Sequence, residues 1–183
     1  MQNHRVGASI PHAPRKSSHL PGQAGHNFKK VSALVVDRSE LMRETLVSVL
    51  RSLGLGDVRA SDNPAYAFEL FLRDPFDFVF TDWSPRLDGI SLLKTLRLDP
   101  STPSPYVPVV MVSANTESRH IFHARDNGVH EYVAKPFTAK RLYAHMASIV
   151  DRHRTFIRSL SYFGPDRRRR KIPYPGKERR HES

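Results

Sequence analysis

The stretch FDFVFTD at residues 76–82, with GISLLKTLRL at residues 89–98 close behind it, decides the fold. The first segment is short, almost wholly apolar, and ends in an acid, Asp82. A strand that is apolar on both faces is typical of a parallel sheet covered by helices on both sides. The second segment has the apolar spacing of a helix. Together they predict one strand–helix unit of such a sheet.

The same alternation of strand and helix occurs five times between residues 31 and 160. We predict the other strands at residues 31–36, 58–61, 109–113 and 131–135. We predict the other helices after Ser39, from Pro64, over residues 117–128, and from Thr138 to about Leu160, with Ser39 and Thr138 as N-caps. The alternation therefore predicts an α/β fold with a doubly wound, five-stranded parallel sheet.

Positive charge is concentrated at the two ends of the chain, whose formal net charge is +11. Residues 1–30 carry five basic and no acidic side chains, residues 31–150 carry 13 basic and 14 acidic ones, and residues 151–183 carry 11 basic and four acidic ones. We therefore predict a disordered basic N-terminal segment (1–28), a folded domain (29–155) and an arginine-rich tail (156–183). Concentrated positive charge attracts nucleic acid, nucleotides, anionic lipid or acidic protein surfaces.

Composition excludes several classes of protein. The chain has no cysteine, which rules out a disulfide framework, a cysteine-type zinc site and a thiol nucleophile. No apolar run approaches the roughly 18 residues of a membrane span, so we expect no membrane insertion. The N-terminus lacks the apolar core of a secretory signal. We therefore expect a cytoplasmic protein.

Polar side chains follow four of the predicted strands, namely Asp37, Asp82, Ser113 and Lys135. The carboxyl ends of parallel strands meet at one edge of a sheet, where ligands bind at the switch in strand order. This set suits phosphoryl transfer to a carboxylate, in which one aspartate attacks, the other helps hold Mg2+, and the hydroxyl and ammonium stabilise phosphoryl oxygens. Any one of these residues could end a strand simply because loops are solvated, but four together favour a site.

Five segments of residues 31–150 resemble the receiver domain of bacterial response regulators, specifically the CheY type. They are LVVDRSELMR, FVFTDW, LDGISLLKTLR, MVSAN and YVAKPFTA. The resemblance implies a flavodoxin-like receiver fold and a signalling protein that is not an enzyme, with a histidine kinase as a candidate partner. It also implies that Asp82 is the phosphoacceptor, Asp37 a Mg2+ ligand, Ser113 and Lys135 phosphoryl contacts, and Tyr132 part of the output face.

Two features depart from the receiver pattern. Receivers carry two adjacent acids after the first strand, whereas Arg38 follows Asp37 here. Because Mg2+ binding depends on carboxylate charge, we expect weaker Mg2+ binding, and Arg38 is a candidate partner for Asp82. The loop DWSPRLDG, from Asp82 to Gly89, is one residue shorter than the family's and lacks its Met–Pro pair.

The tail spells one pattern twice, as YFGPDRR from Tyr162 and YPGKERR from Tyr174. Its glycines and prolines exclude a continuous helix, and its low apolar content predicts a segment without a folded core. A purely electrostatic tail needs neither an acid nor an aromatic at fixed spacing. Arginine pairs with one edge of guanine, a carboxylate accepts from the other edge, and aromatic rings stack on its face. Two copies suit cyclic di-GMP, which has two guanines and two phosphates.

Domain order and the GPDRR motif resemble the Cle group of CheY-like cyclic di-GMP effectors. That resemblance implies that the messenger binds the tail and that the receiver contacts the flagellar motor switch. The candidate ligand contacts are Tyr162, Asp166, Arg167, Arg168, Arg169, Arg170, Tyr174, Glu178, Arg179 and Arg180. Two alternatives remain: a conventional phosphorylated receiver with a solvated tail, and a receiver that binds nucleic acid through its basic ends.

Overall fold

The computed structural model describes residues 25–159 and 162–168. Its centre is a parallel sheet of five strands in the order β2–β1–β3–β4–β5. The strands are β1 (Ser32–Val36), β2 (Asp57–Ser61), β3 (Phe78–Thr81), β4 (Val109–Ser113) and β5 (Glu131–Ala134). The predicted fold class is confirmed. The order reverses between β1 and β3, and this reversal is where the polar strand ends were expected to meet.

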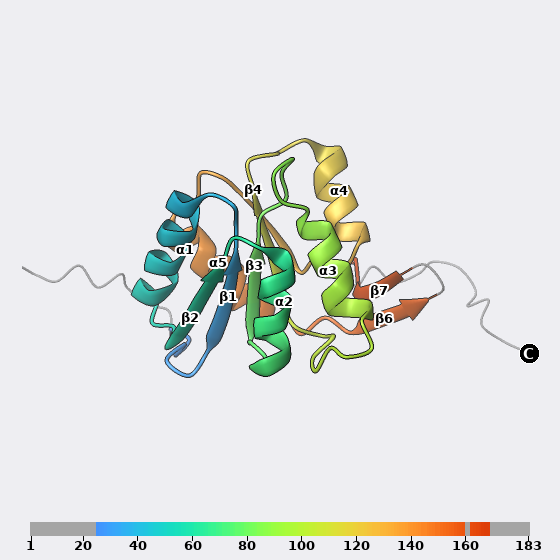
Figure 1. Ribbon diagram of the computed structural model, residues 1–183, viewed down its shortest axis with the longest axis horizontal. Helices are drawn as coiled ribbons and strands as arrows, with labels where there is room; N and C mark the ends of the chain where they lie inside the picture. Colours follow the sequence, from blue (N-terminus) through green and yellow to red (C-terminus); the bar gives the residue numbers. More distant parts are fainter. Residues whose placement is uncertain (1–24, 160–161, 169–183) are drawn as a thin grey trace, which may run out of the picture.

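Five helices cover the sheet: α1 (Glu40–Ser52), α2 (Pro64–Arg73), α3 (Gly89–Leu98), α4 (Ser118–Asp126) and α5 (Ala139–Asp151). Helices α2 and α3 lie in front of the sheet and α5 lies behind it (Figure 1). The predicted caps are present, because the hydroxyl of Ser39 accepts from the Met42 amide and that of Thr138 from the Arg141 amide. No helix within the described ranges is long and apolar enough to cross a membrane.

Alternate residues of β1, β3 and β4 enter two separate cores. Leu34 and Val36 of β1 pack with Phe71 of α2 and Leu93 of α3. Ala33 and Val35 pack instead with residues of α1 and α5. These three strands are thus apolar on both faces because both faces are covered, as the sequence predicted.

The end of α5 differs from the prediction. We expected the helix to run to about Leu160, but it ends at Asp151, where Arg152 leaves the helical conformation with φ −120° and ψ 71°. An antiparallel hairpin follows, made of β6 (Phe156–Ser159) and β7 (Tyr162–Pro165). It lies below α4, far from α1 (Figure 1). The expectation of a tail without folded structure is therefore wrong for these two strands.

Aromatic contacts hold the hairpin on the domain. The rings of Phe156 and Phe163 lie 5.0 and 5.6 Å from that of Tyr106, which precedes β4. Main-chain atoms also approach closely, since a Cβ at Gly164 would lie 2.6 Å from the Cα of Gly128. These contacts join residues far apart in sequence, which is why local patterns did not predict them.

The amino-terminal boundary also differs by a few residues. Phe28, assigned to the disordered segment, is 3% exposed, and its ring packs on Tyr143 of α5. The domain therefore starts slightly before residue 29. The rest of that segment, residues 1–24, lies outside the described residues.

Candidate phosphoacceptor site

The predicted site residues from three strand ends meet at the switch in strand order. Lys135, which follows β5, places its Nζ 2.7 Å from Oδ2 of Asp37 and 2.9 Å from Oδ1 of Asp82. The two carboxylate side chains are only 4% and 7% exposed. Burial disfavours two adjacent negative charges, and the shared ammonium offsets that repulsion.

Surrounding residues fix the Asp37 carboxylate and the main chain of Asp37 and Asp82. Asp37 Oδ1 accepts a 2.8 Å hydrogen bond from the amide of Ser39, and Arg43 Nη1 donates to the main-chain oxygen of Asp37. A Cβ at Gly89 would lie 2.1 Å from the main-chain oxygen of Asp82. Glycine at this position therefore lets α3 begin directly against the residue that follows β3.

Ser113 and Tyr132 line the neighbouring loops. The Ser113 hydroxyl donates to the main-chain oxygen of Trp83 at 2.7 Å, so it reaches the loop that follows Asp82. The Tyr132 hydroxyl donates to the main-chain oxygen of Asn115 at 2.6 Å. Burial raises the pKa of Tyr132, which keeps this phenol protonated and able to donate.

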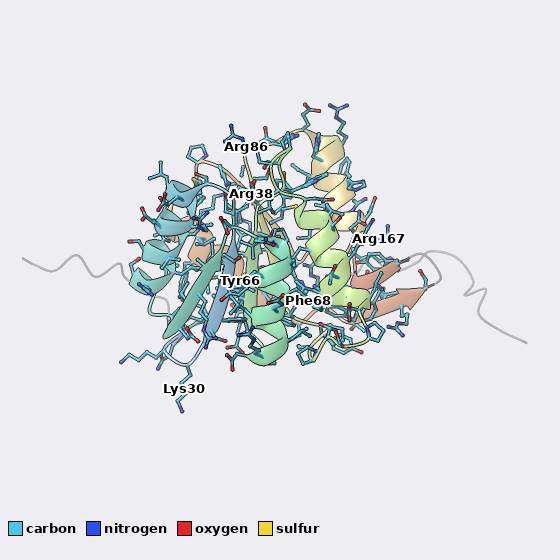
Figure 2. The ribbon with its side chains drawn as sticks, in the orientation of Figure 1. Lys30, Arg38, Tyr66, Phe68, Arg86 and Arg167 are labelled. Atoms are coloured by element: carbon cyan, nitrogen blue, oxygen red, sulfur yellow. The ribbon has the colours of Figure 1, made fainter. Side chains whose placement is uncertain are left out.

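Arg38 does not neutralise Asp82. Its side chain is exposed, and within the described chain the ion pairs of Asp82 and Asp37 are those with Lys135. Figure 2 shows Arg38 in the upper part of the molecule, below Arg86 of the loop after Asp82. The suggested Arg38–Asp82 partnership is therefore wrong, since Lys135 takes that place.

Two converging carboxylates are hard oxygen ligands of the type that Mg2+ prefers. Each has an oxygen within 3 Å of one ammonium nitrogen, so the two groups are close enough to share a cation. No cluster of three or more His, Asp or Glu side chains suited to a metal occurs in the described ranges. Because the two carboxylates lie close together, Asp37 and Asp82 fit Mg2+ as a pair of protein ligands, and other oxygens would complete its coordination shell.

Sequence reasoning missed the aromatic neighbours of this site. The ring of Trp83 lies 4.9 Å from that of His120 and 5.3 Å from that of His123, both on α4. The sequence shows two histidines three residues apart on a helix, but nothing local indicates that a tryptophan from another loop stacks on them. These contacts connect the loop after Asp82 to α4.

In the described part of the tail, two residues predicted to contact the ligand, Tyr162 and Arg167, instead contact other residues of the protein. Arg167 pairs with Asp126 at 3.0 Å and lies over the ring of Tyr162 at 4.3 Å. Tyr162 is 7% exposed, and its hydroxyl donates a hydrogen bond to the main-chain oxygen of Pro165. In this arrangement Tyr162 supports the hairpin, and guanine stacking on it stays a prediction that requires the ring to be uncovered.

The remaining tail contacts divide into two groups. The carboxylate of Asp166 accepts from the amide of Arg168 at 2.9 Å, while the Arg168 side chain is exposed. The other candidates lie outside the described residues: Arg169, Arg170, Tyr174, Glu178, Arg179 and Arg180.

A buried guanidinium under the hairpin was also not foreseen. Arg97 is 3% exposed and donates to the main-chain oxygens of Pro105 and Val107, both at 2.8 Å. The guanidinium carbon of Arg97, Cζ, lies 5.3 Å from the centre of the Phe156 ring. Burial lowers the pKa of Arg97 to about 9, so the group stays charged at neutral pH.

Comparison with known proteins agrees with the fold. Residues 33–147 match the response regulator receiver domain, and the chain belongs to that family. It is 35% identical over 125 residues to chemotaxis protein CheY-3 of Vibrio cholerae, covering 68% of this chain and 95% of that protein. It is 36% identical over 120 residues to chemotaxis protein CheY of Pseudomonas aeruginosa, covering 65% and 95%.

Solved structures give the same architecture. CheY4 of Vibrio cholerae, 20% identical, superposes with a TM-score of 0.58 and covers 65% of this chain and 98% of that one. A putative response regulator from Chloroflexus aurantiacus, 27% identical, gives a TM-score of 0.59 and covers 67% and 100%. The chain is thus a CheY-like receiver domain with extensions at both ends.

Proposed function

We propose that this protein is a CheY-like cyclic di-GMP effector, which binds the messenger through its arginine-rich tail and signals by contact with the flagellar motor switch. The observation that carries this proposal is the repeated aromatic–Gly–acid–Arg–Arg pattern at residues 162–168 and 174–180. Two CheY chemotaxis proteins among its relatives support a role in motility signalling. The protein acts as a signalling component and not as an enzyme, in the cytoplasm.

The tail supplies both kinds of contact that a guanine nucleotide needs. Arginine forms paired hydrogen bonds with the O6/N7 edge, and the acids Asp166 and Glu178 accept from the opposite edge. The other arginines neutralise phosphate through charge-assisted bonds. Each such bond contributes about 1.5–3 kcal/mol, so several are needed to offset the cost of ordering the tail.

Calorimetry on the full chain tests this proposal. The test variant carries residues 169–183 in scrambled order, which keeps amino-acid content and net charge constant. We expect the natural order to bind cyclic di-GMP at least tenfold more tightly than the scrambled chain, because the acid–arginine spacing and not the charge provides recognition. Equal affinity would overturn the proposal.

Two further measurements separate the alternatives. Equal binding of any polyanion, lost steeply as salt rises, would instead indicate a nucleic-acid-binding receiver. GMP is expected to bind much more weakly than cyclic di-GMP, because it has one guanine and one phosphate.

A second function is favoured by the cluster of Asp37, Lys135 and Asp82. We propose that a carboxylate oxygen of Asp82 attacks the phosphorus of a donor, forming an acyl phosphate as the bond to the leaving group breaks. Mg2+, when bound, neutralises charge on the transferring phosphoryl group. Lys135 and Ser113 stabilise the added oxygens, Asp37 holds the metal, and Tyr132 belongs to the face that meets the target. A histidine kinase is the proposed natural donor.

A small phosphodonor tests this second function in the full chain. Trp83 is the single tryptophan and directly follows Asp82, so its fluorescence reports on the site. We expect a Mg2+-dependent change that Asp82→Asn abolishes and that scrambling residues 169–183 leaves intact. A response that survives Asp82→Asn would contradict Asp82 as the phosphoacceptor.

A further inference from the structure

A cavity of about 640 Å3 lies at the end of the sheet opposite Asp82. Its lining includes Phe78, Pro108 and His130, which stand at or just before the amino-terminal ends of β3, β4 and β5. The carboxyl end of α5 and strand β6 close its sides. The volume falls within the range of about 300–1,000 Å3 that is typical of small-molecule sites.

One wall of this cavity is aromatic. Tyr106 is 56% exposed, and its ring meets that of Phe156 edge-on, at 5.0 Å and 82°. The centre of the His130 ring lies 5.5 Å from that of the Phe156 ring. An exposed tyrosine ring that a second ring contacts edge-on offers a flat face on which a planar base can stack.

The rim of the cavity is cationic. Arg152 and Arg168 line it, are exposed, and form no ion pair within the described part of the chain. His153 lies beside them. The acid in the lining, Glu131, is buried and already engaged by His145 at 3.1 Å. The accessible charge is therefore positive and suits a phosphate.

The nature of the occupant follows from these two features together. Rings beside exposed guanidinium groups match a ligand with a planar base and a phosphate, which is a nucleotide. The remainder of the tail is itself strongly basic and would be repelled by Arg152 and Arg168. Arg168 belongs both to this cavity and to the first copy of the repeat.

We propose that the cavity receives one guanine and its adjacent phosphate of cyclic di-GMP, so that the receiver domain forms one wall of the ligand site. Tyr106 stacks on the base, and Arg152 and Arg168 hold the phosphate. This inference rests on the proposed function, and it adds ligand contacts that lie outside the tail.

Calorimetry with cyclic di-GMP on the full chain tests the cavity. The first test variant is Arg152→Glu, with Arg51→Glu as its matched control. Arg51 is an exposed arginine in the last turn of α1 and forms no ion pair with any described residue. The second is Tyr106→Leu, with Tyr66→Leu as its control, since Tyr66 is 48% exposed on α2 (Figure 2). We expect each test variant to bind about tenfold more weakly than its control.

The outcomes distinguish this inference from the proposed function. Wild-type protein that binds no cyclic di-GMP overturns both. Wild-type binding that both test variants retain at the level of their controls overturns the cavity alone and leaves the tail as the whole site. Arg152 is exposed, so its variant stays informative even where Tyr106→Leu loosens the hairpin, and unfolding curves of each variant measure that loosening.

Discussion

Arg38 is the residue that most distinguishes the proposed phosphoacceptor site from the two-acid pattern of receivers. It stands next to Asp37, yet its side chain turns to solvent and Lys135 bridges the two carboxylates. The site thus contains two buried acids with one partly buried cation between them and a second cation nearby. A divalent metal entering this site meets less negative charge than three carboxylates would offer.

Restoring the acid should strengthen metal binding. For Arg38→Asp we expect Mg2+ affinity to rise roughly tenfold, because a carboxylate replaces a cation beside the metal. Titration of Trp83 fluorescence with Mg2+ measures this change, and Arg38→Gln separates loss of the positive charge from gain of a ligand. Unchanged affinity in Arg38→Asp would show that residue 38 does not face the metal.

The hairpin β6–β7 is the element that local patterns did not predict. Strand and helix periods, caps and breakers were enough to predict the five strands of the sheet and the starts of the helices. The hairpin depends instead on Tyr106, Phe156 and Phe163, which are separated by up to 57 residues and meet only in three dimensions. The same limit applies to the candidate site: the strand-end residues were predictable from position, but the bridging geometry of Lys135 was not.

Gly128 allows the hairpin to dock. Its φ is +91°, and a Cβ there would lie 2.8 Å from the main-chain oxygen of Phe163. Gly54 ends α1 with a similar φ of +96° but has open space around its Cβ position. A side chain at either position would strain the backbone, but only a side chain at Gly128 would also collide with the hairpin.

We expect Gly128→Ala to destabilise the protein more than Gly54→Ala, by about 1–3 kcal/mol, because it adds an overpacking cost to a shared φ cost. Chemical unfolding of both variants measures the difference. Equal losses would mean that the hairpin yields without cost and is only weakly held on the domain.

For the molecule as a whole, stability should depend on the protonation of His130. This side chain is 7% exposed, and its Nδ1 accepts from the amide of Val109. Burial and the charges of Arg97 and Arg154 hold its pKa well below 6.5. The folded state therefore keeps His130 neutral while the unfolded chain takes up a proton below about pH 6.5.

The free energy of unfolding should therefore fall on acidification. The contribution of His130 to stability is complete above pH 6.5 and falls as the pH drops below that value, by roughly 1–2 kcal/mol at pH 5. For His130→Asn, which can accept from the same amide, we expect a shallower loss between pH 7 and 5 in unfolding curves. Parallel curves for both proteins would contradict a neutral buried imidazole.

The hairpin places the proposed nucleotide cavity and the proposed phosphorylation site at opposite ends of the sheet. The aspartate cluster stands beyond the carboxyl ends of the strands, whereas the hairpin and its cavity stand at their amino ends. Strand β5, only four residues long, runs from Glu131 at one pole to the residue before Lys135 at the other. The phosphoryl group and the nucleotide that we propose thus lie at opposite ends of the sheet and do not compete for space. The face around Tyr132, which we propose for output, lies between the two sites.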